Sequence, residues 1–238
     1  DRNTLNHSCA HVMAQAVKHL YPNAKFWVGP VVKEGFYYDI DLGDTAVNDD
    51  VIAAIEKEMK KVCKEGKKIY RREISKAEAL ELFKDDEYKL DLIDGLEDGN
   101  ISVYDQGDFT DLCRGPHVDN TKLCKNFKLI KYSGVYWKGD ANNHVMQRIY
   151  GVCFPTAEEL EEHIEQRRLR LEAKIAKLNP DALKHLREHR KEVLQRFKEN
   201  NPEAYAHMIQ HRKEHISRLE KEKPELAAKM KEFYKLDD

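Results

Sequence analysis

The stretch DLCRGPH at residues 111–117 places a carboxylate, a thiol and an imidazole around an Arg-Gly-Pro break. Neither a helix nor a strand continues through such a break, so the Gly-Pro pair predicts a turn. Cys113 and His117 then flank the turn with Cys-x-x-x-His spacing. Because side chains alternate along a strand, Asp111 is expected on the same side of the entering strand as Cys113. The stretch is therefore predicted to position polar side chains.

Segments with strand-like and helix-like patterns surround this turn. Four further strands are predicted near it, at residues 101–105, 109–113, 127–137 and 145–154. The first part of the chain predicts strands at 24–32, 35–42 and 68–74, and helices at 4–21, from Asn48 to near Gly66, and at 75–83. This order favours an α+β fold in which helices pack on an antiparallel sheet.

The last part of the sequence repeats with a period of 22 residues, in units that begin at Asn179, Asn201 and Lys223. Each unit has Pro at its first helical position, which predicts one helix per unit. We therefore expect a first domain at 1–172 and a helical-repeat tail at 173–238. From Glu165 onward the chain has 19 Lys and Arg against 14 Asp and Glu, although its overall formal net charge is −2. A polyanionic partner would be attracted mainly by the tail.

The 238-residue chain has five cysteines without paired spacing, no signal-like segment and no apolar run of 18 residues. These features predict a cytoplasmic protein that does not contact a membrane. The chain begins with Asp1 and not with Met, so a piece of a longer protein is one expectation.

The first predicted helix carries the sequence HSCAH, which places His7 and His11 four residues apart on one face. Such a pair alone is more often a surface accident than a site. Together with Cys113 and His117 it becomes a set of three imidazoles and one thiol. That set is typical of two kinds of site, a four-ligand metal centre or a catalytic cluster of polar side chains that faces a ligand.

These residues, together with GFYYDID, YKLDLI, VYDQGDFTDLCRGPHV and MQRIYG, resemble the editing domain (the second additional domain) of bacterial threonyl-tRNA synthetases. The resemblance covers roughly residues 3–165 and consists of separated motifs in the same order. Related alanyl-tRNA editing proteins share the His-x-x-x-His and Cys-x-x-x-His frame. They lack the GFYYD hairpin and usually have another residue at the place of Pro116, so the threonyl branch is favoured.

The resemblance implies an aminoacyl-tRNA deacylase that cleaves the ester of seryl-tRNA(Thr) and spares threonyl-tRNA(Thr). Its partner would be the 3′ end of mischarged threonine tRNA. Serine is threonine without one methyl group, and one methyl group gives a synthetic site only about 1–3 kcal/mol of discrimination. A second pocket can reject the larger amino acid instead, because it admits serine and excludes threonine sterically.

The resemblance also implies which residues line the site: His7, His11, Lys89, Tyr104, Asp111, Cys113 and His117. Either His117 or Asp111 is expected to orient and deprotonate water. Lys89 is expected to place positive charge near the carbonyl or the ribose. The two histidines of the first helix are expected to hold the ribose and the serine hydroxyl, and Tyr104 to form a pocket wall.

No metal is expected to be required, because Lys89 and Asp111 provide the charge that zinc would otherwise give. If zinc binds, its ligands are His7, His11, Cys113 and His117. Two other functions stay open: a zinc-dependent deacylase of another mischarged tRNA, and a non-catalytic module that binds tRNA or a partner protein. The complete set of polar residues argues against the binding module.

A complete synthetase also has catalytic and anticodon-binding domains, which this sequence lacks. We expect either a free-standing editing protein that acts in trans, with a basic helical tail that grips tRNA, or a fragment of a divergent synthetase. The first is preferred. Contacts between the tail and tRNA phosphates would weaken as the salt concentration rises. A charged helical array is as often an element that binds another protein or forms an oligomer.

Overall fold

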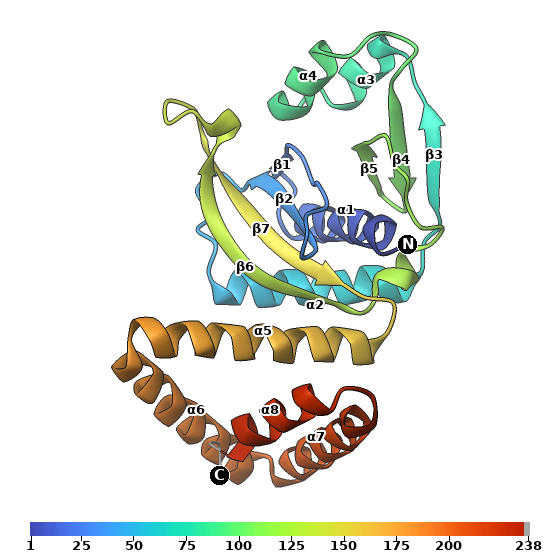
Figure 1. Ribbon diagram of the computed structural model, residues 1–238. Helices are drawn as coiled ribbons and strands as arrows, with labels where there is room; N and C mark the ends of the chain where they lie inside the picture. Colours follow the sequence, from blue (N-terminus) through green and yellow to red (C-terminus); the bar gives the residue numbers. More distant parts are fainter. Residues whose placement is uncertain (236–238) are drawn as a thin grey trace. The chain divides into compact units, whose positions relative to one another are not determined.

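The computed structural model describes residues 1–235 and divides the chain into two compact units, with the division between Leu160 and Glu161 (Figure 1). The first unit contains helices and strands, and the described part of the second is helical. This confirms the predicted α+β class followed by a helical tail. The predicted domain boundary at 172/173 falls inside helix α5 (Ala157–Leu178) and stays a prediction. Residues 236–238 of the predicted tail lie outside the described residues.

The first unit has two long helices. Helix α1 (Arg2–Leu20) is buried along most of its length. Helix α2 (Asp49–Glu65) begins at Asn48, whose side chain accepts a hydrogen bond from the N–H of Val51. It ends at Gly66, which has a left-handed backbone conformation that glycine adopts without steric cost. The predicted start and end of this helix are therefore confirmed.

The strands form two antiparallel sheets. One has the order β1-β2-β7-β6 and consists of Lys25–Phe26, Phe36–Asp41, Val145–Cys153 and Phe127–Tyr136. The other has the order β3-β4-β5 and consists of Ile69–Glu73, Ser102–Gln106 and Phe109–Leu112. Of the predicted strand at 24–32, only Lys25–Phe26 is a regular strand, although Trp27, Val28 and Pro30 also form backbone hydrogen bonds with β2.

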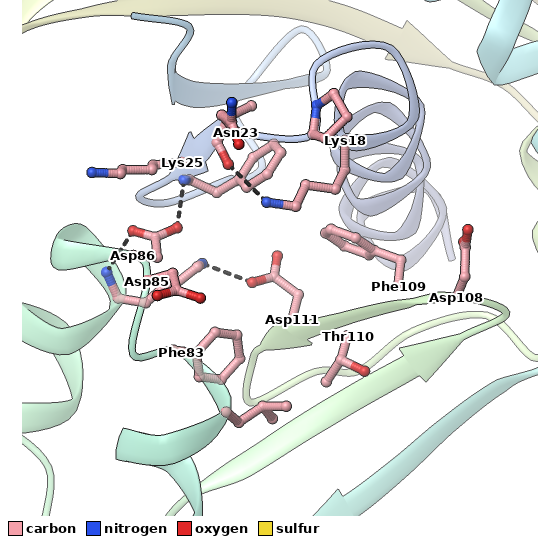
Figure 2. Close-up of a pocket in the computed structure, with 15 residues that line it drawn as sticks. Lys18, Asn23, Lys25, Phe83, Asp85, Asp86, Asp108, Phe109, Thr110 and Asp111 are labelled. Atoms are coloured by element: carbon pink, nitrogen blue, oxygen red, sulfur yellow. Dashed lines mark hydrogen bonds and ion pairs between the residues drawn. The ribbon is translucent and has the colours of Figure 1, made fainter.

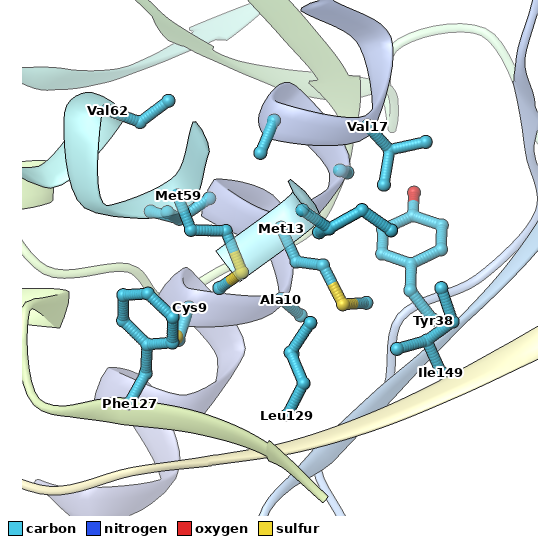
Figure 3. Packing of buried hydrophobic residues seen from close by; sticks show 14 of the residues in the cluster. Cys9, Ala10, Met13, Val17, Tyr38, Met59, Val62, Phe127, Leu129 and Ile149 are labelled. Atoms are coloured by element: carbon cyan, nitrogen blue, oxygen red, sulfur yellow. The ribbon is translucent and has the colours of Figure 1, made fainter. Parts of the chain in front are cut away.

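The core of the first unit lies between the two long helices and the four-stranded sheet (Figure 3). Met13 from α1 and Met59 from α2 are fully buried, and Leu129 and Ile149 reach them from the sheet. Cys9 is a fully buried free thiol in the same core. Because α1 is anchored in this way, its polar residues are held at fixed positions.

The sequence patterns do not indicate the short helix α4 (Glu87–Asp94), which carries Lys89. The carboxylate of Asp86 caps this helix by accepting hydrogen bonds from the N–H groups of Tyr88 and Lys89. It also accepts from the N–H of Phe26 and so ties α4 to β1. A helix of eight residues gives a weak periodic signal, and tertiary contacts stabilise it. The remaining short elements are α3 (Lys76–Leu82), η1 (Thr121–Cys124) and η2 (Trp137–Gly139).

The second unit is built from most of α5, followed by α6 (Pro180–Asn200), α7 (Pro202–Glu222) and α8 (Pro224–Lys235). Each of the last three helices begins with Pro, as the 22-residue period predicts. Its buried cluster consists of Leu219, Ala227 and Met230. None of the helices within residues 1–235 is long and apolar enough to cross a membrane.

Asn6 joins α1 to the end of β7 through two buried hydrogen bonds. Its amide donates to the carbonyl of Cys153 (3.0 Å), and its oxygen accepts from the N–H of Cys153 (2.9 Å). Asn6→Ala leaves both backbone groups unpaired, so we expect the free energy of unfolding to fall by about 2–4 kcal/mol. Urea denaturation measures the change. Asn3→Ala, at an exposed position of the same helix, should cost less than about 0.5 kcal/mol. Equal losses in the two variants would contradict this prediction.

Candidate active site

The two histidine-containing motifs meet in the first unit. Helix α1 presents His7 and His11, and the loop after β5 presents Cys113 and His117. One nitrogen or sulfur atom from each residue lies within 4.8 Å of those of the other three. The turn depends on Gly115, whose φ is +76° and where a Cβ would overlap the phenol ring of Tyr104. The structure thus brings the motifs together, and their catalytic use stays a prediction.

Hydrogen bonds on the Nδ1 atoms hold the rings of His7 and His117. His7 Nδ1 lies 3.1 Å from the carbonyl oxygen of Pro116, which only accepts, so this nitrogen carries the proton. His117 Nδ1 lies 3.0 Å from the hydroxyl oxygen of Ser8. The two Nε2 atoms both face the sulfur of Cys113, at 3.3 Å from His7 and 3.1 Å from His117. Two imidazole nitrogens therefore share one thiol.

Burial keeps this cluster uncharged. It lowers the pKa of His117 to about 2 and raises the pKa of the Cys113 thiol to about 11. Burial also lowers the pKa of His7, against the opposing effect of its hydrogen bond with Pro116. Near neutral pH the residues are neutral imidazoles and a thiol. The cluster then has more hydrogen-bond acceptors than protons, so a bound ligand is expected to supply donors such as water, hydroxyl or ammonium groups.

Asp111 lies beside this cluster and is only 1% exposed. Its Oδ1 lies 2.7 Å from the Nζ of Lys89, and its Oδ2 accepts a hydrogen bond from the hydroxyl of Tyr38 at 2.6 Å. Burial by itself disfavours the ionised carboxylate, but the charge of Lys89 opposes it, and the pKa of Asp111 is lowered. Asp111 is therefore a buried anion neutralised by a buried cation.

Lys89 uses all of its protons within the protein. Its ammonium contacts Asp111, the hydroxyl of Tyr38 (2.9 Å) and the carbonyl oxygen of Trp27 (2.9 Å). An ammonium group has three N–H donors, so none is left for a substrate in this arrangement. The expected role of Lys89 near the scissile carbonyl or the ribose stays a prediction. Helix α4 directs the side chain into the interior, where its charge stabilises Asp111.

His11 connects the carboxylate to the histidine cluster. Its Nε2 lies 3.5 Å from Asp111 Oδ2, and its buried Nδ1 has no hydrogen-bond partner within the described part of the chain. Burial lowers the pKa of His11 to about 4, although the charge of Asp111 acts in the opposite direction. With the proton on Nε2, toward the carboxylate, the Nδ1 lone pair is one more unused acceptor.

Tyr104 from β4 lies edge-on against the ring of His117, with 4.4 Å between the ring centroids, and its role as a pocket wall stays a prediction. Two residues that contact the site, Tyr38 and Ser8, were not predicted from the sequence. Strand alternation in GFYYDID places every second side chain inward and is a signal for Tyr38. Ser8 lies inside the HSCAH motif, next to His7, and no local pattern indicates its partner.

A cavity of about 560 Å³ borders Lys89 and Asp111 but none of the three histidines (Figure 2). Phe109 and Asp111 from β5 form one part of its wall, and Asp86 at the start of α4 forms another. The cavity meets the candidate site only at the Lys89–Asp111 pair. The histidine–cysteine cluster, which has the free acceptors, is therefore the candidate reaction centre.

The same cluster fits zinc by its donor chemistry. His7 Nε2, His117 Nε2 and the sulfur of Cys113 already converge, and His11 offers a fourth donor nearby. Imidazole nitrogen and thiolate sulfur are both usual ligands of tetrahedral zinc. The expectation that no metal is required stays a prediction.

Comparison with known proteins agrees with the motifs. Residues 101–150 match the family described as threonyl and alanyl tRNA synthetase second additional domain. The chain is 52% identical over 177 residues to the threonine–tRNA ligases of Staphylococcus aureus strains JH9, Newman and JH1. The matched stretch is 73% of this chain and 27% of each relative. The chain therefore spans about a quarter of the length of these curated relatives.

The buried Lys89–Asp111 pair yields a stability prediction. Lys89→Met leaves Asp111 as an unpaired buried charge, so we expect the free energy of unfolding to fall by about 3–5 kcal/mol at neutral pH. The double variant Lys89→Met/Asp111→Asn should lose less, because no lone charge remains. Lys138→Met, which removes an exposed cation that pairs with Asp91, should lose at most about 1 kcal/mol.

The pH dependence of this loss has a defined sign. The lowered pKa of Asp111 means that its contribution is present above the unfolded pKa, about 3.9, and is lost as pH falls through the folded value. The stability difference between wild type and Lys89→Met should therefore shrink below about pH 4. Urea denaturation at a series of pH values measures it, and a difference that grows on acidification would refute the assignment.

Proposed function

Because the first unit is a second additional domain of the threonyl-tRNA synthetase type, we propose that it is an aminoacyl-tRNA deacylase. Its proposed substrate is seryl-tRNA(Thr), whose ester it hydrolyses, whereas threonyl-tRNA(Thr) is spared. The proposal applies to the unit whether it acts alone or within a synthetase. The grip of the basic tail on tRNA stays a prediction.

The observation that carries this proposal is the excess of acceptors in the cluster. His7, His117 and His11 each direct a nitrogen lone pair that lacks a full partner, while Cys113 has one proton to share. The end of an aminoacyl-tRNA carries the matching donors: an α-ammonium group, a free ribose hydroxyl and, for serine, a side-chain hydroxyl. The attacking water adds two more. Donors and acceptors therefore complement each other.

Of the two expected bases, His117 is the better candidate. Both oxygens of Asp111 are engaged by Lys89, Tyr38 and His11, so this carboxylate is not free to take a proton from water. His117 has an unprotonated Nε2 in the cluster. Its pKa of about 2 applies to the site without substrate. A tetrahedral oxyanion formed nearby would raise the basicity of the imidazole as the proton is transferred.

The other residues then take supporting roles. Asp111 lies 3.5 Å from Nε2 of His11, and its negative charge favours the tautomer of His11 with the proton on that nitrogen. His7 is a second acceptor for the ribose or the serine side chain. Tyr104 limits the space beside His117. Exclusion of threonine requires only that the added methyl group meets such a wall, since the site must reject one extra carbon.

The deacylation rate tests this proposal directly. The full chain should release serine from seryl-tRNA(Thr) and leave threonyl-tRNA(Thr) intact in the same assay. His117→Ala should lower the rate by at least about 100-fold, which is the usual contribution of an acid–base group. His144→Ala, at an exposed position of the first unit, is the matched control and should retain the rate. Hydrolysis of both aminoacyl esters at equal rates, or of neither ester, would contradict the proposal.

A zinc-dependent deacylase is the second candidate, because the same four residues fit that metal. His7, His11, Cys113 and His117 would hold the ion, which would lower the pKa of a bound water. We expect the deacylase to work without a metal ion, so treatment with EDTA should leave the deacylation rate unchanged. Elemental analysis should find less than about one zinc per ten chains, a ratio too low for a structural site. Stoichiometric zinc with activity lost on chelation would favour the second candidate.

A further inference from the structure

Ser8 lies in the middle of the candidate site, although its side chain is fully buried and lines neither the cavity of about 560 Å³ nor the one beside Arg71 and Arg114. It follows His7 on α1, and its hydroxyl reaches across to the loop that carries His117. Three groups surround the oxygen: the carbonyl of Thr4 (3.0 Å), the N–H of Val118 (2.9 Å) and Nδ1 of His117 (3.0 Å).

The proton count at this hydroxyl decides the state of His117. A serine hydroxyl has one proton to donate and two lone pairs to accept with. The carbonyl of Thr4 only accepts, so it takes the single hydroxyl proton. The N–H of Val118 only donates, so it fills one lone pair. The remaining lone pair faces Nδ1 of His117, which must therefore carry a proton.

We propose that Ser8 is a positioning residue that holds His117 in the Nδ1–H tautomer, so that the unprotonated Nε2 is the atom presented to the reaction centre. The inference rests on the proposed function and adds a residue that acts through the proposed base. In the opposite tautomer, Nε2–H would face Cys113, and Nδ1 would face an oxygen whose only proton is already donated. The site would then lack its base.

Ser8 also couples the two elements that form the site. The hydroxyl oxygen of Ser8 contacts the backbone N–H of Val118 and the side chain of His117, and its proton is donated to the carbonyl of Thr4 on α1. The orientation of the imidazole is therefore set relative to the helix that carries His7 and His11. His7 obtains the same tautomer independently, from the carbonyl of Pro116. Loss of Ser8 should release only one of the two rings.

Nitrogen-15 NMR of the full chain with labelled histidine tests the tautomer without any activity assay. In wild type, His117 should show a protonated Nδ1 and an unprotonated Nε2 near neutral pH. In Ser8→Ala, its two nitrogen shifts should move toward an average of the tautomers, while those of His7 stay unchanged. Wild-type His117 with its proton on Nε2 would overturn the inference, even if Ser8→Ala does not fold.

Kinetics supply the second readout. Ser8→Ala should lower kcat for seryl-tRNA(Thr) by about 10-fold with KM nearly unchanged, as expected from the loss of one neutral hydrogen bond that acts on the base. Ser8→Thr keeps the hydroxyl and should recover most of the rate. Ser133→Ala, at an exposed serine on β6, should behave as wild type. A fall that Ser8→Thr does not reverse, with the wild-type tautomer retained in Ser8→Ala, would show a packing role only.

The two proposals fail in different ways. If wild type does not deacylate seryl-tRNA(Thr), the proposed function fails, whereas the tautomer of His117 is still measured by NMR. If wild type deacylates and His117 carries its proton on Nε2, only the role of Ser8 is lost.

Discussion

A carboxylate that is ionised in the protein interior constrains the whole first unit. Removing Asp111 from water costs several kcal/mol unless a cation and hydrogen-bond donors surround it. Three separate elements meet this requirement: α4 supplies Lys89, β2 supplies Tyr38 and α1 supplies His11. The small helix α4 must therefore dock against the sheet for the carboxylate to remain charged. Neutralisation of this anion thus joins α1, α4 and β2 to the strand that carries Asp111.

The same burial makes the neighbouring cluster neutral and poor in protons. The imidazoles of His7, His11 and His117 resist protonation because water is largely excluded. They are therefore available as acceptors at neutral pH, and the Nδ1 contacts of His7 and His117 decide which atoms accept. A site of this kind suits a substrate that brings its own donors. The negative charge that develops during ester hydrolysis would also assist proton transfer to an imidazole.

Local patterns in the sequence predicted much of this arrangement. The i, i+4 spacing places His7 and His11 on one helix face, and the Gly-Pro break places Cys113 and His117 around one turn. These features depend on neighbours in the chain. The position of Lys89 is different, because its helix is short and its partners come from distant strands. Strand pairing into two sheets also depends on contacts between distant residues, which periodicity does not report. Ser8 gave no signal, since its role depends on the loop that crosses α1 over 100 residues later.

We propose that the neutral histidine cluster receives the aminoacyl end of the tRNA. The decisive experiment is a titration of the nitrogen-15-labelled chain with an adenosine that carries serine through a non-hydrolysable amide. We expect saturable shifts of the imidazole nitrogens of His7, His11 and His117, with weaker binding of the threonine analogue. Binding that leaves these three rings unchanged, or equal affinity for both analogues, would show that the aminoacyl end binds elsewhere or without selection against threonine.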